Sequence, residues 1–437
     1  MWVRAAIFIF LILIIQLSAY PPQAIARDEQ PGVAFTGVYL MGNYQSKNKF
    51  PVFTRNQSKL RDAIRIEMKK ADGQGILPFN LLFDTDTEEV KQRIDNTLSL
   101  AFVVVRDDVV AESFNAADTI INKTIINVGL TAIIYDTRKI DDKERNTVVF
   151  SFPLVGYSQR LDGNTKCSDE EIDKLFVESA VTTLRENLVK RLAGVKLSDI
   201  SGDITGSERG TITVNIGSTN GIEEGQFVAI LSSGKKVASA AIIRLNKNSA
   251  VVELPKEFTV TPGMKVRAVN MRASSDETMQ VIDVKVTSKK ALKLFPQETV
   301  GPQVAQWFSN FLTDRGGKIV LPSRVGGEWD QRATGTAFSL IDRAGMEHQF
   351  ELPPPKYPVL LDITGVSSKV TDSNAVNEIC LFKAWIKVTI PAKQYEKEFS
   401  TFSSKSLIKG IQSFEEKNEF FDLLYQLTAK IAKEAEI

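Results

Sequence analysis

Two stretches of the chain alternate apolar and polar residues, which is the pattern of a β-strand with one buried face. The alternating apolar positions are Ile126, Val128, Leu130, Ala132 and Ile134 in one stretch and Cys380, Phe382, Ala384, Ile386 and Val388 in the other. Each stretch predicts a sheet that has one side on the core and the other side open to solvent or to a partner.

Helical patterns surround these strands in matching pairs. Both halves of the chain open with a strand-like run, TGVYL at 36–40 and MQVIDVKV at 279–286, and a helix follows each run. Both halves also close with a helix that begins at a predicted capping box, Ser168 with Glu171 and Ser413 with Glu416. In the first pair of helices, the apolar stripe is Leu60, Ile64 and Met68 in the first half and Val304, Phe308 and Phe311 in the second half. In the second pair, it is Ile172, Phe176, Leu184 and Leu188 in the first half and Phe420, Leu424, Leu427 and Ile431 in the second half.

The spacing of these features indicates an internal repeat. Three matched positions stand 245, 244 and 245 residues apart, namely Phe50 and Phe295, Pro78 and Pro322, and Ser168 and Ser413. We interpret this as two copies of one α+β domain, at 33–195 and 276–437. Convergence of two similar patterns is the alternative.

The segment between the copies, 196–272, is a run of short strands separated by tight turns, which predicts a small all-β, barrel-like domain. Its stretch TITVNIGSTNGIEEGQFVAI at 211–230 contains Gly217, Gly221 and Gly225. These glycines do not form a phosphate loop, because strand follows turn follows strand and no G-x-x-x-x-G-K-[ST] sequence is present. We therefore expect turn residues, with positive φ at Gly221, Gly225 and Gly263, and no bound nucleotide.

Composition narrows the class of partner. The chain has 437 residues, with 54 Lys plus Arg against 53 Asp plus Glu. Because no strong positive field exists to attract a polyanion, nucleic acid is not an expected partner.

The first residues resemble a secretory signal peptide. Arg4 precedes an apolar run to about Tyr20, and Ala24-Ile25-Ala26 fits a cleavage site, so residues 1–26 are expected to be removed. An uncleaved membrane anchor is the alternative. No cysteine lies near this site to carry a lipid, and we expect a mature chain in the periplasm, with outer-membrane association left open.

The sequence has two cysteines, Cys167 and Cys380, which could be joined in a disulfide or remain free thiols. Cys167 lies in a polar loop and Cys380 on the apolar face of a strand, so a disulfide between them is the less favoured of two alternatives.

Catalytic chemistry has little support. The only histidine, His348, excludes multi-histidine metal sites, and no nucleophile motif accompanies it. We expect a surface histidine, no enzyme activity, no catalytic, metal or cofactor-binding residues, and no cofactor; a periplasmic hydrolase is the weakest alternative.

Two clusters of lysines are candidate binding surfaces for peptidoglycan, anionic lipid or an acidic partner. The more ordinary interpretation is a solvated face. The clusters are Lys47, Lys49, Lys59, Lys69 and Lys70 around the first helix, and Lys289, Lys290 and Lys293 at the matching place in the second half.

The middle segment resembles a known family. Residues 208–270, with TVNIGSTNGIEEGQFVAI, SGKKVASAAIIRLNKNSAVVEL and TPGMKVRAV, are similar to the carboxy-terminal domain of the flagellar assembly protein FlgT. The flanking domains resemble α+β modules of FlgT, of the TolB amino-terminal domain and of the CsgG and LpoB group of envelope proteins.

This resemblance implies a non-enzymatic envelope assembly or scaffold protein. Such a protein would dock with envelope proteins, with a ring-forming assembly or with itself, and flagellar basal-body assembly is one setting. An accessory protein of a secretion channel or of a cell-wall synthase is the alternative. In FlgT the barrel-like domain ends the chain, whereas here another domain follows it, which puts a strictly flagellar role in doubt.

Overall fold

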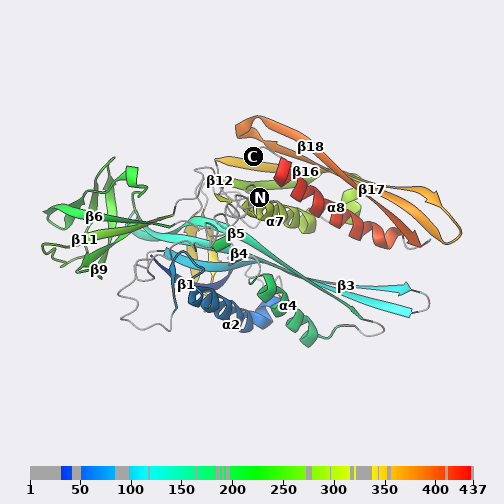
Figure 1. The fold of residues 1–437 in the computed structure, drawn as a ribbon, viewed down its shortest axis with the longest axis horizontal. Coiled ribbons are helices and arrows are strands. Elements are labelled where there is room, and N and C mark those ends of the chain that lie inside the picture. Colours follow the sequence, from blue (N-terminus) through cyan, green and yellow to red (C-terminus); the bar gives the residue numbers. More distant parts are fainter. Residues whose placement is uncertain are drawn as a thin grey trace, which may run out of the picture.

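In the computed structural model, two sheet-and-helix units lie side by side and a barrel lies at one end of the molecule (Figure 1). The strands and helices form three hydrophobic cores, one for each of these parts. The structure describes residues 31–41, 51–83, 98–116, 119–162, 166–183, 185, 188, 191–192, 197–271, 278–295, 297–314, 319–320, 337–342, 344–351, 356–408 and 412–434. The predicted signal peptide, 1–26, lies outside them.

The first unit is a sheet covered by two helices. Its elements are β1 (Gly32–Met41), α2 (Pro51–Gly73), β2 (Asn80–Leu82), β3 (Leu98–Ala116), β4 (Thr119–Ile140), β5 (Lys143–Asp162) and α4 (Asp169–Thr183). The predicted stripe of Leu60, Ile64 and Met68 on α2 is fully buried. The predicted apolar face of β4 is buried with it in the same core, since every second residue of a strand points to the same side.

The second unit repeats this order. Its elements are β12 (Thr278–Val286), α6 (Lys289–Leu294), α7 (Gln297–Asp314), β13 (Ile319–Val320), β16 (Tyr357–Ser373), β17 (Asn377–Ile390), β18 (Tyr395–Ile408) and α8 (Gln412–Glu434). Strands run β13-β12-β16-β17-β18 in this sheet and β2-β1-β3-β4-β5 in the first. In each sheet the first two pairings are parallel and the next two are antiparallel.

The residues between the units form a closed barrel of six strands, which confirms the predicted barrel-like segment. The strands are β6 (Leu197–Glu208), β7 (Thr211–Val214), β8 (Phe227–Ser232), β9 (Lys235–Leu245), β10 (Ala250–Glu253) and β11 (Lys265–Met271). Gly221, Gly225 and Gly263 have φ of 80°, 81° and 88°, as expected for turn residues. The φ of Gly217 is −146°; here a Cβ would lie 2.5 Å from the carbonyl oxygen of Asn246, so glycine is required by close packing.

A hairpin from the second half of the chain belongs to the first sheet. Strands β14 (Ala337–Ile341) and β15 (Glu347–Glu351) lie within the predicted domain 276–437, yet β15 pairs with β5 and β14 pairs with β1. These pairings close β1, β3, β4, β5, β15 and β14 into a ring, with β2 beside β1. The two halves of the chain are therefore joined by strand pairing as well as by covalent linkage.

Helices α7 and α8 lie between the two sheets (Figure 1). Helix α7 packs on β12 of its own sheet and also contacts β5 of the first sheet, and the Arg191 guanidinium donates to the Asn310 side chain across this junction, at 2.5 Å. No described helix is both long and apolar enough to cross a membrane.

The predicted capping box at Ser168 is confirmed. The Ser168 hydroxyl accepts from the backbone N–H of Glu171 at 3.3 Å, and the Glu171 carboxylate accepts from that of Ser168 at 2.9 Å. At the counterpart a helix also begins, since α8 starts at Gln412, but the Glu416 carboxylate pairs with Lys290 and Ser368, and the side chain of Ser413 lies outside the described residues. Side chains from α6 and β16 thus hold the Glu416 carboxylate.

Candidate functional site

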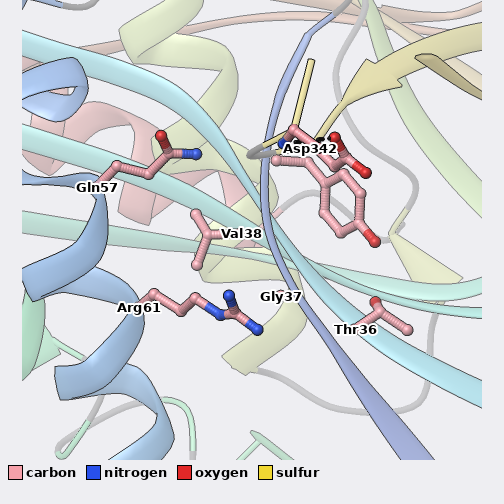
Figure 2. Close-up of a pocket in the computed structure, with 8 residues that line it drawn as sticks. Thr36, Gly37, Val38, Gln57, Arg61 and Asp342 are labelled. Atoms are coloured by element: carbon pink, nitrogen blue, oxygen red, sulfur yellow. Dashed lines mark hydrogen bonds between the residues drawn. The ribbon is translucent and has the colours of Figure 1, made fainter. Parts of the chain in front are cut away.

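A pocket of about 420 Å³ lies where β1, α2 and the turn between β14 and β15 meet (Figure 2). Residues Thr36 to Tyr39 of β1 form its floor, and α2 contributes Gln57 and Arg61, which are four residues apart and so share one face of the helix. The turn contributes Asp342 and Ala344. The pocket thus needs both halves of the chain.

The position of β1 in this pocket is set by a β-bulge. Its pairing with β3 shifts between Phe35 and Gly37, and Gly37 has a φ of 128°, which L side chains rarely adopt. The Thr36 hydroxyl donates to the Leu100 carbonyl at 3.1 Å, which fixes the bulge on β3. A Cβ at Gly37 would have no atom within 4 Å, so the glycine opens onto free space.

Asp342 organises the turn beside the pocket. One oxygen of its carboxylate accepts from the backbone N–H groups of Ala344 and Met346, at 2.8 and 2.9 Å, and the other lies 3.0 Å from Nε2 of His348. Partial burial acts to raise the pKa of Asp342, but the hydrogen bonds from His348, Met346 and Ala344 outweigh it and hold the pKa below its usual value.

The single histidine has a structural setting. His348 lies in β15, and its side chain is 34% exposed, so the predicted surface histidine is in fact partly covered. Its ring packs edge-on against Tyr39 of β1, with centroids 5.7 Å apart, while Nε2 faces Asp342. These contacts join the β14–β15 hairpin to the first sheet.

A buried tyrosine lies behind this contact. Tyr135 on β4 hydrogen-bonds with Tyr39, Thr36 and Ser99, and its ring is 4.9 Å from that of Phe350 on β15. Burial raises the pKa of Tyr135 to about 12. The neutral phenol is thereby held in the hydrogen-bonded network that lines the closure of the first sheet.

The lysines singled out from the sequence are dispersed. Lys70 pairs with Glu67 at 2.9 Å, Lys69 lies over the ring of Phe83, and Lys290 pairs with Glu416 at 2.5 Å. Lys59 lines a separate groove between α2 and α4, beside acidic residues of α4. Exposed Lys289 and Lys293 lie on α6, and Lys47 and Lys49 fall outside the described residues.

The two cysteines do not form a site. Cys167 and Cys380 carry thiols and are not joined in a disulfide; Cys380 is fully buried in the predicted apolar face of β17, where burial raises its pKa. Within the described part of the chain, no group of three His, Cys, Asp or Glu side chains is placed to hold a metal ion.

The pocket itself was not found from the sequence. Thr36, Gln57, Arg61 and Asp342 come from segments up to three hundred residues apart, and they are ordinary residues for a strand, a helix and a turn. The one local signal is Gly37 within an otherwise continuous strand pattern, because an isolated glycine in a strand indicates a bulge or a close approach.

Comparisons with known proteins assign no family. No protein-family model matches the chain and no curated protein matches it, so the resemblance of 208–270 to FlgT gains no support from them. Among solved structures, a neuraminyllactose-binding hemagglutinin homolog from Helicobacter pylori is 11% identical over 40% of this chain and 91% of its own, with a TM-score of 0.25. A minor lipoprotein from Acinetobacter baumannii is 7% identical over 38% and 93%, with a TM-score of 0.21. A lipopolysaccharide binding protein covers 76% of the chain at 7% identity and a TM-score of 0.09. These scores are too low to place the chain in the fold of any of the three proteins.

Proposed function

We propose that this protein is a non-enzymatic docking protein of the cell envelope, which binds partner proteins through the second sheet. The carrying observation is the face of that sheet that points away from α8. It presents Leu381, Lys383 and Trp385 of β17 and Phe402 of β18, and the Phe402 side chain is 67% exposed. Aromatic side chains such as Trp and Phe are enriched in protein interfaces, so an exposed Phe beside a Trp supports docking at this face.

The arrangement of this face supports docking. Phe402 of β18 lies directly opposite Lys383 of β17, and Trp385 of β17 lies directly opposite Ser400 of β18. Because these two pairs are two residues apart along the strands, Phe402 and Trp385 point to the same face and are diagonal neighbours. The Trp385 ring also lies over Gly365, where a Cβ would be 2.9 Å from it. Strand β18 ends the sheet among the described residues, and its outer edge offers further backbone groups to a partner.

The repeat supports a modular scaffold. We infer that the two sheet units are copies of one domain, because strand order and strand direction recur and because the pairings of β1 with β3 and of β12 with β16 both contain a bulge. Two copies of one sheet unit, joined in the sequence by the barrel segment, would make the protein modular. Export directed by the predicted signal peptide would place this surface in the envelope, and flagellar or cell-wall assembly is a finer part of the proposal.

Photo-crosslinking in living cells tests the proposal. A benzophenone amino acid at position 402 is expected to give a discrete higher-mass adduct in the envelope fraction. The same substitution at Tyr425, which is 46% exposed on α8 behind the sheet, is the matched control and is expected to give none. Equal adducts from both positions, or none from 402, would show that this face does not dock. Replacing His348 with Gln is expected to leave the adduct unchanged.

A further inference from the structure

Strand β18 ends the second sheet, and no described strand pairs with its outer edge (Figure 1). It runs from Tyr395 to Ile408, 14 residues, and pairs with β17 in one unbroken register. The turn that precedes it, 391–394, is described, and the three residues that follow it, 409–411, lead into α8 and are too few to run beside so long a strand. Neither neighbour of β18 in the sequence therefore covers this edge.

The matching edge of the first sheet does hold a strand. Strand β5 takes the same place in the order of its sheet, and its outer edge pairs with β15 at Asn146 and Thr147. The opposite end of the second sheet is different again, because β13 there has only two residues, Ile319 and Val320. A strand that short offers little to another chain, whereas β18 offers an edge of roughly 46 Å at about 3.3 Å per residue.

Strand β18 has few of the features that keep an edge strand from pairing. It contains no proline, and its pairing with β17 has no bulge, whereas both pairings of β16 do. Its charged residues lie toward the two ends and leave an uncharged run, Phe399 to Ser404, in which Phe402 is 67% exposed. The Lys430 ammonium lies 3.2 Å from the Ser400 carbonyl oxygen. Since a carbonyl oxygen accepts two hydrogen bonds, this contact does not close the edge.

The sequence of β18 is complementary to itself when two copies run antiparallel with Phe402 at the centre. The directly opposed pairs are then Phe402 with Phe402, Thr401 with Ser403, Ser400 with Ser404, Phe399 with Lys405, Glu398 with Ser406 and Lys397 with Leu407. No two like charges are opposed in this register. Aromatic pairs and pairs of Thr with Ser are among the cross-strand pairs that stabilise a sheet.

We propose that a second copy of this chain binds along this edge, with the β18 strands of the two copies antiparallel and Phe402 opposite Phe402. This pairing rests on the proposed function, since it names a second copy as the partner of the same sheet. Backbone hydrogen bonds between the two edges supply the affinity, and the side chains fix the register. A two-fold axis relates the two strands, so the assembly closes as a dimer.

Charges at positions 400 and 404 test this register in the purified chain. Both serines are exposed, and each lies opposite the other in the second copy. Ser400→Lys with Ser404→Lys opposes like charges in both pairs, whereas Ser400→Lys with Ser404→Glu opposes unlike charges at the same positions. In sedimentation equilibrium, the parent chain and the lysine–glutamate variant should have twice the mass of one chain. The double-lysine variant should dissociate with a constant at least about tenfold higher, with the circular dichroism of the parent.

Cysteines at the same positions test the register without added charge. The background is Cys167→Ser, in which the remaining cysteine, Cys380, is fully buried. A mixture of Ser400→Cys and Ser404→Cys chains should form a disulfide between copies, because directly opposed residues lie within disulfide distance. Each variant oxidised alone should form far less, since its two cysteines stand four residues apart along the paired strands.

A chain that stays monomeric at about 100 µM, or double-lysine and lysine–glutamate variants that dimerise equally well, would overturn the inference. Disulfides that form as readily in each single cysteine variant as in the mixture would also overturn it. A monomeric chain whose position 402 crosslinks to another protein would remove only this inference. A dimer in the expected register with equal adducts from positions 402 and 425 would remove only the proposed function.

Discussion

Gly225→Ala should reveal how strongly the barrel is fixed to the first unit. Gly225 has a φ of 81°, and a Cβ there would lie 3.0 Å from the carbonyl oxygen of Lys139, which belongs to β4. The backbone N–H of Lys139 donates to the Gly225 carbonyl at 2.8 Å, and ion pairs from Arg138 to Glu223 and from Lys139 to Glu253, at 2.5 and 2.6 Å, hold the same junction. The Lys139 backbone therefore has little freedom to move away.

A second glycine isolates the contribution of the junction. Gly234 has nearly the same φ, 77°, with nothing within 4 Å of a Cβ. Gly234→Ala should lower the free energy of unfolding by about 1 kcal/mol. This value is the cost of a left-handed backbone conformation at alanine, reduced by the stabilisation that comes from the lower entropy of the unfolded chain. Gly225→Ala carries the same strain and also displaces the bond to Lys139, so we expect about 2 kcal/mol in total.

Hydrogen exchange measured by mass spectrometry on the full chain is the assay. The free energy of opening of barrel peptides should fall by about 1 kcal/mol in Gly234→Ala and by about 2 kcal/mol in Gly225→Ala. Peptides covering Arg138 to Asp142 at the β4–β5 turn should exchange faster only in Gly225→Ala. Equal effects of the two variants, at the barrel and at the turn, would refute the argument that the junction constrains Gly225.

Three further predictions concern an ion pair, the amino-terminal segment and a turn of the barrel. The hydrogen bond from Arg185 lowers the pKa of Glu67 to about 2, against the opposing effect of burial, so the ionised Glu67 stabilises the fold above its ordinary pKa of 4.5 and this stabilisation is lost as the pH falls toward 2. Glu67→Gln should therefore reduce the fall in the free energy of unfolding over this pH range by about 1 kcal/mol, and an acid unfolding curve unchanged by the substitution would contradict the prediction. Amino-terminal sequencing of exported protein should begin at Arg27, whereas a membrane-bound form that keeps residues 1–26 would show an anchor. Gly221→Val should destabilise the barrel by roughly 1–2 kcal/mol, because φ is 80° there; ATP should not shift the melting temperature of the unsubstituted chain, and a shift that Gly221→Val abolishes would indicate a phosphate site.

Local patterns in the sequence determined much of this molecule. The alternating faces of β4 and β17, the stripes of α2 and α8 and the turn glycines all follow from the periods of strands and helices and from the few residues that tolerate positive φ. The Ser168 cap was predictable for the same reason, since its partner is three residues away.

Only the tertiary structure decided which strands meet. Residues 337–351 fall within the predicted second unit, but they complete the first sheet, because strand pairing depends on partners hundreds of residues away that no local period encodes. The pocket depends on that pairing, since β14 pairs with β1 and the turn that follows β14 brings Asp342 into the pocket that Arg61 of α2 also lines. Ser413 shows the same limit on a smaller scale: its sequence fits a cap, yet Glu416 is held by Lys290 and Ser368 from other elements, whose positions are set by packing of the whole sheet.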